Sequence, residues 1–338
     1  VELIFTMTSG NTVWMAAGAN IATTLSIFLS FMYLFTYYKR QGRQIGREIK
    51  KSVNYRYQNV KTIVKNILHV SIPMSLSSIM SSFNKNIDSF TVVRNLKTFM
   101  SEADAKAQYG ILSGKVDTLT SLPLAINIAF ATALVPAISA ARMKGDQETI
   151  TKRTSFSLLA SMLIGLPCTA GMLIFAGPIL NLLFPNATNG TTILQISSLT
   201  IIFTILDQTI NGTLQGIGKI MIPATSLGFG MLTKLIVNLI LVPIPAFGAN
   251  GAAIGSVACH MVAFTIAFNV LRKNVKLNLT FKKFVLKPLM ATIIMSVCSY
   301  FIYIVLKGII IERLATIIAM IVAVVIYGLS ILALRILN

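Results

Sequence analysis

Charged side chains are scarce in this sequence. Only 12% of its 338 residues are Asp, Glu, Lys or Arg, and 55% are hydrophobic, with a mean hydropathy of +0.77. Soluble domains carry about 25% charged residues, so the deficit excludes an ordinary soluble domain and indicates lipid as the main solvent. Acidic residues are the scarcest, ten against 29 Lys and Arg, which gives a net charge of +19. The basic residues lie between apolar runs of about 20 residues, so we expect membrane lipids and no nucleic acid as partners.

Cysteine and histidine are also rare, with three and two copies. Cys168, Cys259 and Cys298 lie inside apolar runs without metal-ligand spacing, so the sequence predicts neither a disulfide framework nor a metal site. Paired catalytic carboxylates and a catalytic triad are lacking, and the G-x-G-K of residues 216–219 does not have the spacing of a phosphate-binding loop. We therefore expect a protein that is not an enzyme, with no catalytic residues and no cofactor.

Long apolar runs fill most of the chain. Each is long enough, at 1.5 Å per helical residue, to cross a hydrocarbon core of about 30 Å. The pattern predicts an all-α polytopic membrane protein with about nine transmembrane helices. The expected spans are 11–37, 67–93, 118–140, 155–184, 193–215, 220–243, 250–271, 285–306 and 314–335.

The loops between the spans differ in charge. Residues 38–65 contain nine Lys or Arg and one acid, whereas the loops 185–192 and 243–250 contain no basic residue. Since basic loops stay on the cytoplasmic side, this alternation places the linker 38–66 in the cytoplasm. Its segment VNYRYQNVKTIVKNI has two interpretations, a helix lying on the anionic inner leaflet or a solvated linker helix.

Two spans begin alike. The first contains AAGANIATTLSIF (16–28), the seventh AFGANGAAIGSVA (246–258), and each runs inward to a basic pair. Small residues four apart, as at Gly251 and Gly255, permit close helix contact, and repeated halves are common in transporters. We therefore expect 1–37 to be the last helix of a first lobe, 67–271 a complete six-helix second lobe, and 272–338 two tail helices. The chain begins with Val1 and not Met, so we expect the rest of the first lobe upstream.

Two stretches carry a family resemblance. LSGKVDTLTSLPLAINIAFATALVPAIS (112–139) resembles the eighth helix of the multidrug/oligosaccharidyl-lipid/polysaccharide exporter superfamily. LQGIGKIMIPATSLGFGMLTKLIVNLILVPIPAFGANGAAIGSV (214–257) is similar to the branch with polysaccharide exporters, MurJ-type lipid II flippases and stage V sporulation protein B. The resemblance implies fourteen helices in two rocking lobes plus a tail, of which this chain holds the last nine. It also implies alternating-access transport of a polyprenyl-pyrophosphate-linked glycan across the bacterial plasma membrane.

Span 67–93 has a polar face along its whole length, with Asn84, Lys85 and Asp88 in its outer half. Lipid cannot solvate such a face, so it must meet protein or water. Each ionised group costs about 2.5–3.5 kcal/mol in a membrane span even on the lenient insertion scale. The i, i+3 spacing lets Lys85 pair with Asp88. We interpret these residues as lining a substrate cavity, with snorkelling of Lys85 as the alternative.

Four further residues are candidates for the same cavity. Lys234 lies in the outer half of its span, and Asp207 lies nearer the inner side. Asp207 either carries a coupling ion or serves a packed core, and the sequence leaves both open. Lys115 and Asp117 lie at the outer mouth of span 118–140, where an interfacial ion pair is the plainer interpretation.

The sequence thus predicts a flippase or exporter for lipid-linked cell-wall or polysaccharide precursors. The alternatives are an ion-coupled multidrug exporter of the same superfamily and a non-transporting scaffold in envelope or spore assembly. Lysines inside the membrane favour an anionic substrate. The glycan, the coupling to H⁺ or Na⁺, and the oligomeric state stay open at this point.

Overall fold

The structure, a computed structural model, describes residues 12–51, 59–185, 187–277 and 279–336. These residues form helices and no strand, which confirms the all-α prediction. Eight of the described helical segments are long and apolar enough to cross a membrane, and they overlap eight of the nine expected spans. The remaining expected span, 11–37, begins outside the described residues and otherwise lies in α2 (Thr12–Lys51). The chain is therefore a multi-pass membrane protein.

The chain divides into two compact units, Val1–Lys65 and Asn66–Asn338. The first unit contains α2, which continues beyond residue 37 to Lys51. Much of the basic linker is thus helical, although residues 52–58 of its amphipathic segment lie outside the described part of the chain. The helix α3 (Val60–Leu96) contains the division between the two units.

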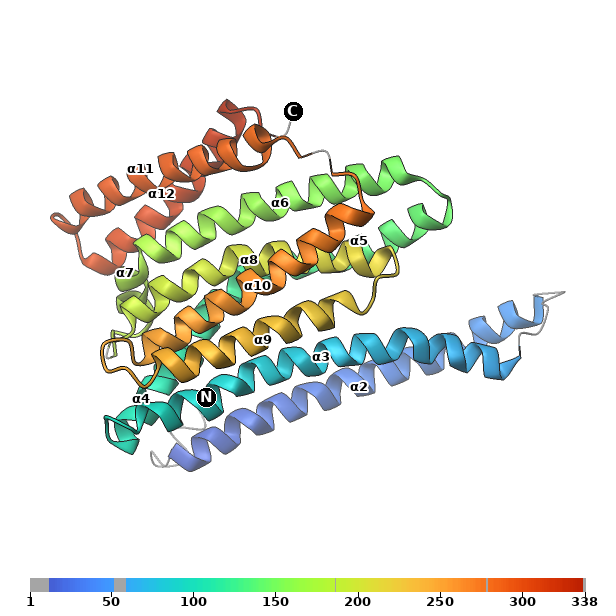
Figure 1. Cartoon of the computed structure of the whole chain (residues 1–338), viewed down its shortest axis with the longest axis horizontal. Helices are drawn as coiled ribbons and strands as arrows, with labels where there is room; N and C mark the ends of the chain where they lie inside the picture. Colours follow the sequence, from blue (N-terminus) through green and yellow to red (C-terminus); the bar gives the residue numbers. More distant parts are fainter. Residues whose placement is uncertain (1–11, 52–58, 186, 278, 337–338) are drawn as a thin grey trace. The chain divides into compact units, whose positions relative to one another are not determined.

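The second unit holds the remaining helices in a bundle (Figure 1). After α3 they are α4 (Glu102–Gly110), the π-helix η1 (Ile111–Val116), α5 (Asp117–Met143), α6 (Gln147–Ile174), α7 (Ala176–Leu183), α8 (Thr191–Gly216), α9 (Ile222–Leu241), α10 (Ala249–Asn274), the π-helix η2 (Lys282–Leu286), α11 (Lys287–Lys307) and α12 (Glu312–Ala333).

Two expected spans differ from the observed helices. The span 118–140 is too short, because α4 and η1 run without interruption into α5 and the apolar helical segment is Glu102–Met143. The span 155–184 is two helices, because the chain leaves the helical conformation at Phe175, between α6 and α7. The hydropathy pattern does not detect either feature, since α4 and η1 carry charged and polar residues like a loop and Phe175 is as hydrophobic as its neighbours.

Helix α8 is the centre of the bundle. It packs against α5, α6 and α10, and more than half of its most apolar stretch is buried. Gly212 lets α5 and α8 approach closely, because a Cβ there would lie 2.6 Å from the Ala131 carbonyl oxygen. Leu134 and Ile138 of α5 pack with Ile210 of α8 in the same buried apolar cluster. Close small-residue contacts of this kind are how helices associate in lipid.

The small residues of α10 face α9 at equally short distances. A Cβ on Gly251 would lie 3.0 Å from the Val242 nitrogen, and one on Gly255 would lie 2.2 Å from Asn238 Oδ1. The predicted close contact at Gly251 and Gly255 is therefore confirmed. The two glycines let α10 pack directly against α9 and leave room for the Asn238 side chain between the helices.

The last two helices form a hairpin against α6 and α7. Tyr327 donates a hydrogen bond of 2.8 Å to the Leu163 carbonyl oxygen of α6. Glu312, at the start of α12, accepts from Asn181 of α7 at 3.0 Å. Figure 1 shows α11 and α12 lying together beside α6. The hairpin is thus held to the bundle by polar contacts as well as apolar packing.

Helix α3 is buried only near its C-terminal end. Its buried residues are Asp88, Thr91, Val92 and Leu96, and the last two belong to the same apolar cluster as Leu112 of η1. The preceding serine-rich part of α3 is exposed or half-buried. Helix α3 is therefore anchored to the bundle at one end, and Ser77, Ser78 and Ser81 of its polar face line a cavity.

Candidate functional site

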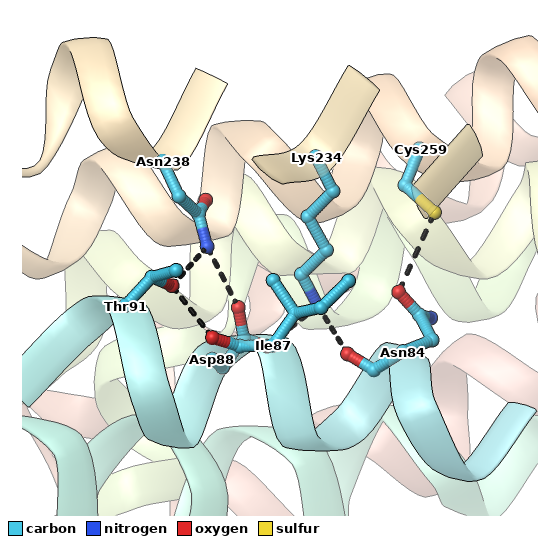
Figure 2. A network of polar contacts seen from close by, with 7 residues as sticks. All are labelled: Asn84, Ile87, Asp88, Thr91, Lys234, Asn238 and Cys259. Atoms are coloured by element: carbon cyan, nitrogen blue, oxygen red, sulfur yellow. Dashed lines mark hydrogen bonds and ion pairs between the residues drawn. The ribbon is translucent and has the colours of Figure 1, made fainter. Parts of the chain in front are cut away.

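A buried ion pair joins α3 to α9 (Figure 2). Lys234 Nζ lies 2.6 Å from Asp88 Oδ2, and the two residues are only 3% and 7% exposed. The Lys234 ammonium also donates to the Asn84 carbonyl oxygen at 3.2 Å. Both charges thus have a partner of opposite sign inside the protein, which offsets much of the cost of burying them.

The second carboxylate oxygen of Asp88 is satisfied as well. Asn238, one turn beyond Lys234 on α9, donates to Asp88 Oδ1 at 3.0 Å and to Thr91 Oγ1 at 3.0 Å. Figure 2 shows Lys234 and Asn238 pointing from α9 toward Asn84, Asp88 and Thr91 on α3. Cys259 of α10 makes a weak contact of 3.6 Å with Asn84 Oδ1. These residues fix the position of the C-terminal end of α3.

The predicted pairing of Lys85 with Asp88 is wrong. Asp88 faces α9, and Lys85, three residues earlier, has an exposed side chain with no ion-pair partner within 4 Å in the described part of the chain. The i, i+3 spacing places the two side chains only about 60° apart around α3 and so permits the pair, but the Lys234 ammonium lies beside the Asp88 carboxylate instead. Lys234 therefore neutralises Asp88, and Lys85 stays an unpaired cation on α3.

A polar cavity of about 340 Å³ lies beside the middle of α3, at Ser77, Ser78 and Ser81. Its lining is rich in hydroxyl and amide groups, and no lysine or arginine of the described chain belongs to it. Asp207 is its one acidic residue and His260 its one histidine. The polar lining residues are Ser77, Ser78, Ser81, Thr132, Thr204, Asp207, Gln208, Asn211, Gln215 and His260.

Asp207 is 8% exposed and accepts a hydrogen bond of 2.9 Å from Asn211, one turn further along α8. A buried network of side-chain hydrogen bonds positions Gln208, the next residue in the sequence. Asn127 donates to Gln208 Oε1 at 3.0 Å, and Ser161 in turn donates to Asn127 Oδ1 at 2.9 Å. The satisfied network holds α5, α6 and α8 together next to the cavity wall.

The predicted interfacial pair of Lys115 and Asp117 is also wrong. Lys115 Nζ donates to the Ala187 carbonyl oxygen at 2.5 Å and lies 5.3 Å from the centre of the Phe184 ring. The Asp117 side chain is exposed and lies within electrostatic range of Asp88, Lys234 and Lys85. Lys115 therefore stabilises the loop between α7 and α8, and Asp117 lies with the α3–α9 ion pair.

The whole chain matches a known family. The sequence profile of the lipid II flippase MurJ covers residues 1–334. The chain belongs to the MurJ family.

Two curated relatives of this MurJ-family chain are from Bacillus subtilis strain 168. An uncharacterized membrane protein, YabM, is 28% identical over 246 residues, which are 72% of this chain and 44% of the relative. Stage V sporulation protein B is 22% identical over 273 residues, 80% of this chain and 52% of the relative. The chain thus spans about half the length of the curated relatives that it matches.

Solved structures agree on the fold. A lipid II flippase MurJ in an inward closed conformation has a TM-score of 0.60 at 16% identity and covers 86% of this chain and 59% of its own. An outward-facing multidrug resistance transporter of the MATE family, in the MOP superfamily, has a TM-score of 0.52, also at 16% identity. It covers 80% of this chain and 65% of its own. The MurJ-family fold is therefore shared with MOP exporters.

Of the seven candidates from the sequence, the structure brings Asn84, Asp88 and Lys234 together. Asp207 lines the separate cavity. Thr91, Asn238 and His260 are not among these seven candidates. Asn238 carried a signal, since it lies one turn from Lys234 on the same helix face. His260 did not, because a lone histidine among small residues looks the same whether it faces a cavity or a packed core.

Proposed function

We propose that this chain forms the second-lobe part of a flippase in the bacterial plasma membrane. Its substrate is a polyprenyl-pyrophosphate-linked saccharide, and it works by alternating access with the linker 38–66 on the cytoplasmic side. MurJ-family membership and the shared MOP fold support a membrane flippase. The substrate is our inference from the chemistry of the described residues.

The polar cavity carries this proposal. A cavity with ten polar side chains inside a membrane-spanning bundle must be filled by water or by a polar ligand, because lipid tails cannot satisfy its hydrogen bonds. Most of the hydroxyl groups donate to their own helices and accept from the cavity, and the side-chain amides both donate and accept, which suits the hydroxyl-rich surface of a saccharide. The cavity therefore fits the glycan better than it fits the phosphates.

Lys85 is the candidate for the phosphate contact. It follows Ser78 by seven residues and Ser81 by four, so it lies on the cavity side of α3 and one to two turns further along. Its ammonium is unpaired in the described structure, unlike that of Lys234, which Asp88 neutralises. We therefore assign headgroup attraction to Lys85 and the placement of α3 to Lys234.

The test is translocation of a lipid-linked precursor by the full-length protein, measured as precursor accessible at the outer leaflet. Lys85→Ala is expected to lower the rate about tenfold, the loss of a charge contact of about 1.4 kcal/mol, and Lys85→Arg is expected to retain it. Lys152→Ala, which removes an exposed cation from α6, is the matched control. Normal transport by a folded, membrane-inserted Lys85→Ala protein would remove Lys85 from the mechanism.

A second candidate function, export of organic cations, has one observation in its favour. Asp207 is the one carboxylic acid that lines the cavity, and no lysine or arginine of the described chain lines it. Cells that express the full-length protein test this alternative by their efflux of a fluorescent organic cation. Efflux that Asp207→Asn abolishes, together with unchanged precursor transport, favours the drug exporter. Absence of both activities in a folded protein favours a scaffold.

A further inference from the structure

The arginine at the end of α5 packs against the backbone of a neighbouring turn. A Cβ on Gly218, in the turn between α8 and α9, would collide with Arg142 Nη1 and lie 3.2 Å from Arg142 Cζ. Gly218 also has a φ of +78°, a conformation that favours glycine. The guanidinium group of Arg142 therefore rests on a turn that has no room for a side chain at this point.

The same turn is held to α5 by two further contacts. Ser139 donates a hydrogen bond of 3.2 Å to the Gly216 carbonyl oxygen. A Cβ on Gly216 would lie 2.7 Å from the Cβ of Ile138, which is fully buried. Since backbone packing fixes the end of α5 against the turn, it also fixes the place from which the Arg142 side chain leaves α5.

The Arg142 guanidinium has five N–H donors, and it makes no hydrogen bond and no ion pair with the described residues. Lys219, directly after Gly218, is exposed and likewise unpaired within the described chain. The acids nearest to Arg142 in sequence are engaged elsewhere, because Asp146 caps α6 and Glu148 pairs with a lysine of its own helix. Two adjacent cations without a counter-charge attract an anion.

The polar cavity begins next to these two cations. Val135 of α5 lines the cavity, and Arg142 follows it by seven residues, two turns further along the same helix face. Gln215 lines the cavity from α8, four residues before Lys219. The proposed orientation places this end of the bundle in the cytoplasm. Lys85 lies beyond the other end of the cavity, so an unpaired cation stands beyond each end.

We propose that Arg142 and Lys219 bind the diphosphate of the lipid-linked substrate at the cytoplasmic membrane surface, before its saccharide enters the cavity. A guanidinium group presents paired donors that fit two phosphate oxygens at once, and the adjacent ammonium group adds a second positive charge. The ligand's identity rests on the proposed function, whereas the geometry by itself calls for a phosphate. An anionic phospholipid is the other source of that chemistry, and the experiment separates the two.

Binding is measured by isothermal titration calorimetry on the purified full-length protein in nanodiscs of neutral phosphatidylcholine. The probe is farnesyl diphosphate, which has the diphosphate and a short prenyl chain but no saccharide. The wild-type protein is expected to bind the probe saturably. Arg142→Ala is expected to weaken binding about tenfold, the effect of one charge-assisted contact. Arg142→Lys should recover only part of the loss, because lysine lacks the paired donors.

Two further variants separate a built site from general surface charge. Gly218→Ala keeps every charge but places a Cβ against the guanidinium, so it is expected to weaken binding about as much as Arg142→Ala. Lys144→Ala removes an exposed cation from the same end of α5. It is the matched control, and its affinity should change less than about twofold. The thermal unfolding midpoint of each variant confirms that it is folded.

Three outcomes would overturn the proposal. The first is a folded Arg142→Ala protein that binds the probe as tightly as the wild-type protein. The second is an equal loss of affinity in Lys144→Ala and Arg142→Ala, since any surface cation then serves. The third is competition by soluble dihexanoyl phosphatidylglycerol at the affinity of the probe, which assigns the site to a phospholipid.

The binding measurement is separate from transport, so this site and the proposed function can fail independently. Normal precursor transport by a folded Arg142→Ala protein that has also kept its probe affinity removes the site and leaves the function. Probe binding that depends on Arg142, in a protein that transports no precursor, supports the site and removes the function.

Discussion

Lys234 of α9 and Asp88 of α3 lie 146 positions apart in sequence and form an ion pair of 2.6 Å inside the bundle. The pair and its Asn238 amide connect α3 to the rest of the bundle at the point where α3 becomes buried. Because both partners are buried, removing one leaves the other charge uncompensated, which costs far more than losing an exposed pair. The pair therefore controls where α3 lies, and the cavity along α3 depends on it.

Breaking this ion pair should destabilise the fold strongly. We expect Lys234→Met to lower the free energy of unfolding by about 3–5 kcal/mol, because Asp88 then lacks its cation. The double variant Asp88→Leu with Lys234→Met should recover most of the loss, since no buried charge remains. Thermal unfolding in detergent checks this. Equal stability of Lys234→Met and the wild-type protein would contradict the assignment of Lys234 as the anchor of α3.

Gly255, which lies opposite Asn238, should not tolerate a larger side chain. A Cβ at Gly255 would lie 2.2 Å from Asn238 Oδ1, so Gly255→Ala must displace an amide that holds Asp88. We expect a loss of about 1–3 kcal/mol, the usual cost of overpacking. Gly228→Ala is the control on α9, because nothing lies within 4 Å of its Cβ position, and it should be neutral or stabilising by up to about 1 kcal/mol. Chemical unfolding of the two variants should separate them clearly.

Glu312 should hold the last two helices to the bundle. It accepts from Tyr303 at 2.7 Å and Lys307 at 3.0 Å with one oxygen and from Asn181 at 3.0 Å with the other. Glu312→Ala leaves these donors without their acceptor, which should cost about 1–3 kcal/mol. We expect faster hydrogen exchange at the start of α12, with exchange in α8 unchanged. Faster exchange throughout the bundle would instead indicate general unfolding.

The start of α6 should depend on pH. The hydroxyl and N–H groups of Thr149 hold the pKa of the Asp146 carboxyl below its usual range. Since the folded pKa is the lower one, the cap contributes stability above the unfolded pKa and loses it as the pH falls through the folded pKa. Asp146→Ala should therefore be less stable than the wild-type protein at neutral pH and equal to it in strong acid. Asp146→Asn, which also caps helices, should show no such pH dependence in thermal unfolding.

The hydropathy pattern predicted the helices well and the site less well. Apolar runs long enough to cross a bilayer have few alternatives to helix, because lipid leaves no other way to satisfy the backbone. The break at Phe175 was not predictable this way, since it interrupts a continuous apolar run, and the early helix start at Glu102 was not, since α4 is helical although its sequence is polar. The charged residues of α3 were correctly recognised as unusual. The partner of Asp88, however, was expected to be its neighbour Lys85 and is Lys234.

The sequence by itself determined that this is a multi-pass helical membrane protein of the MurJ type, with polar residues along one span and small residues between α9 and α10. It did so because composition and periodicity are properties of the chain. Only the tertiary structure decided that Lys234 neutralises Asp88, that Lys85 has no ion-pair partner among the described residues and that Asp207 faces a cavity that none of their lysines or arginines lines. Ion pairing and burial depend on distances between helices far apart in sequence, and no spacing along one helix encodes them.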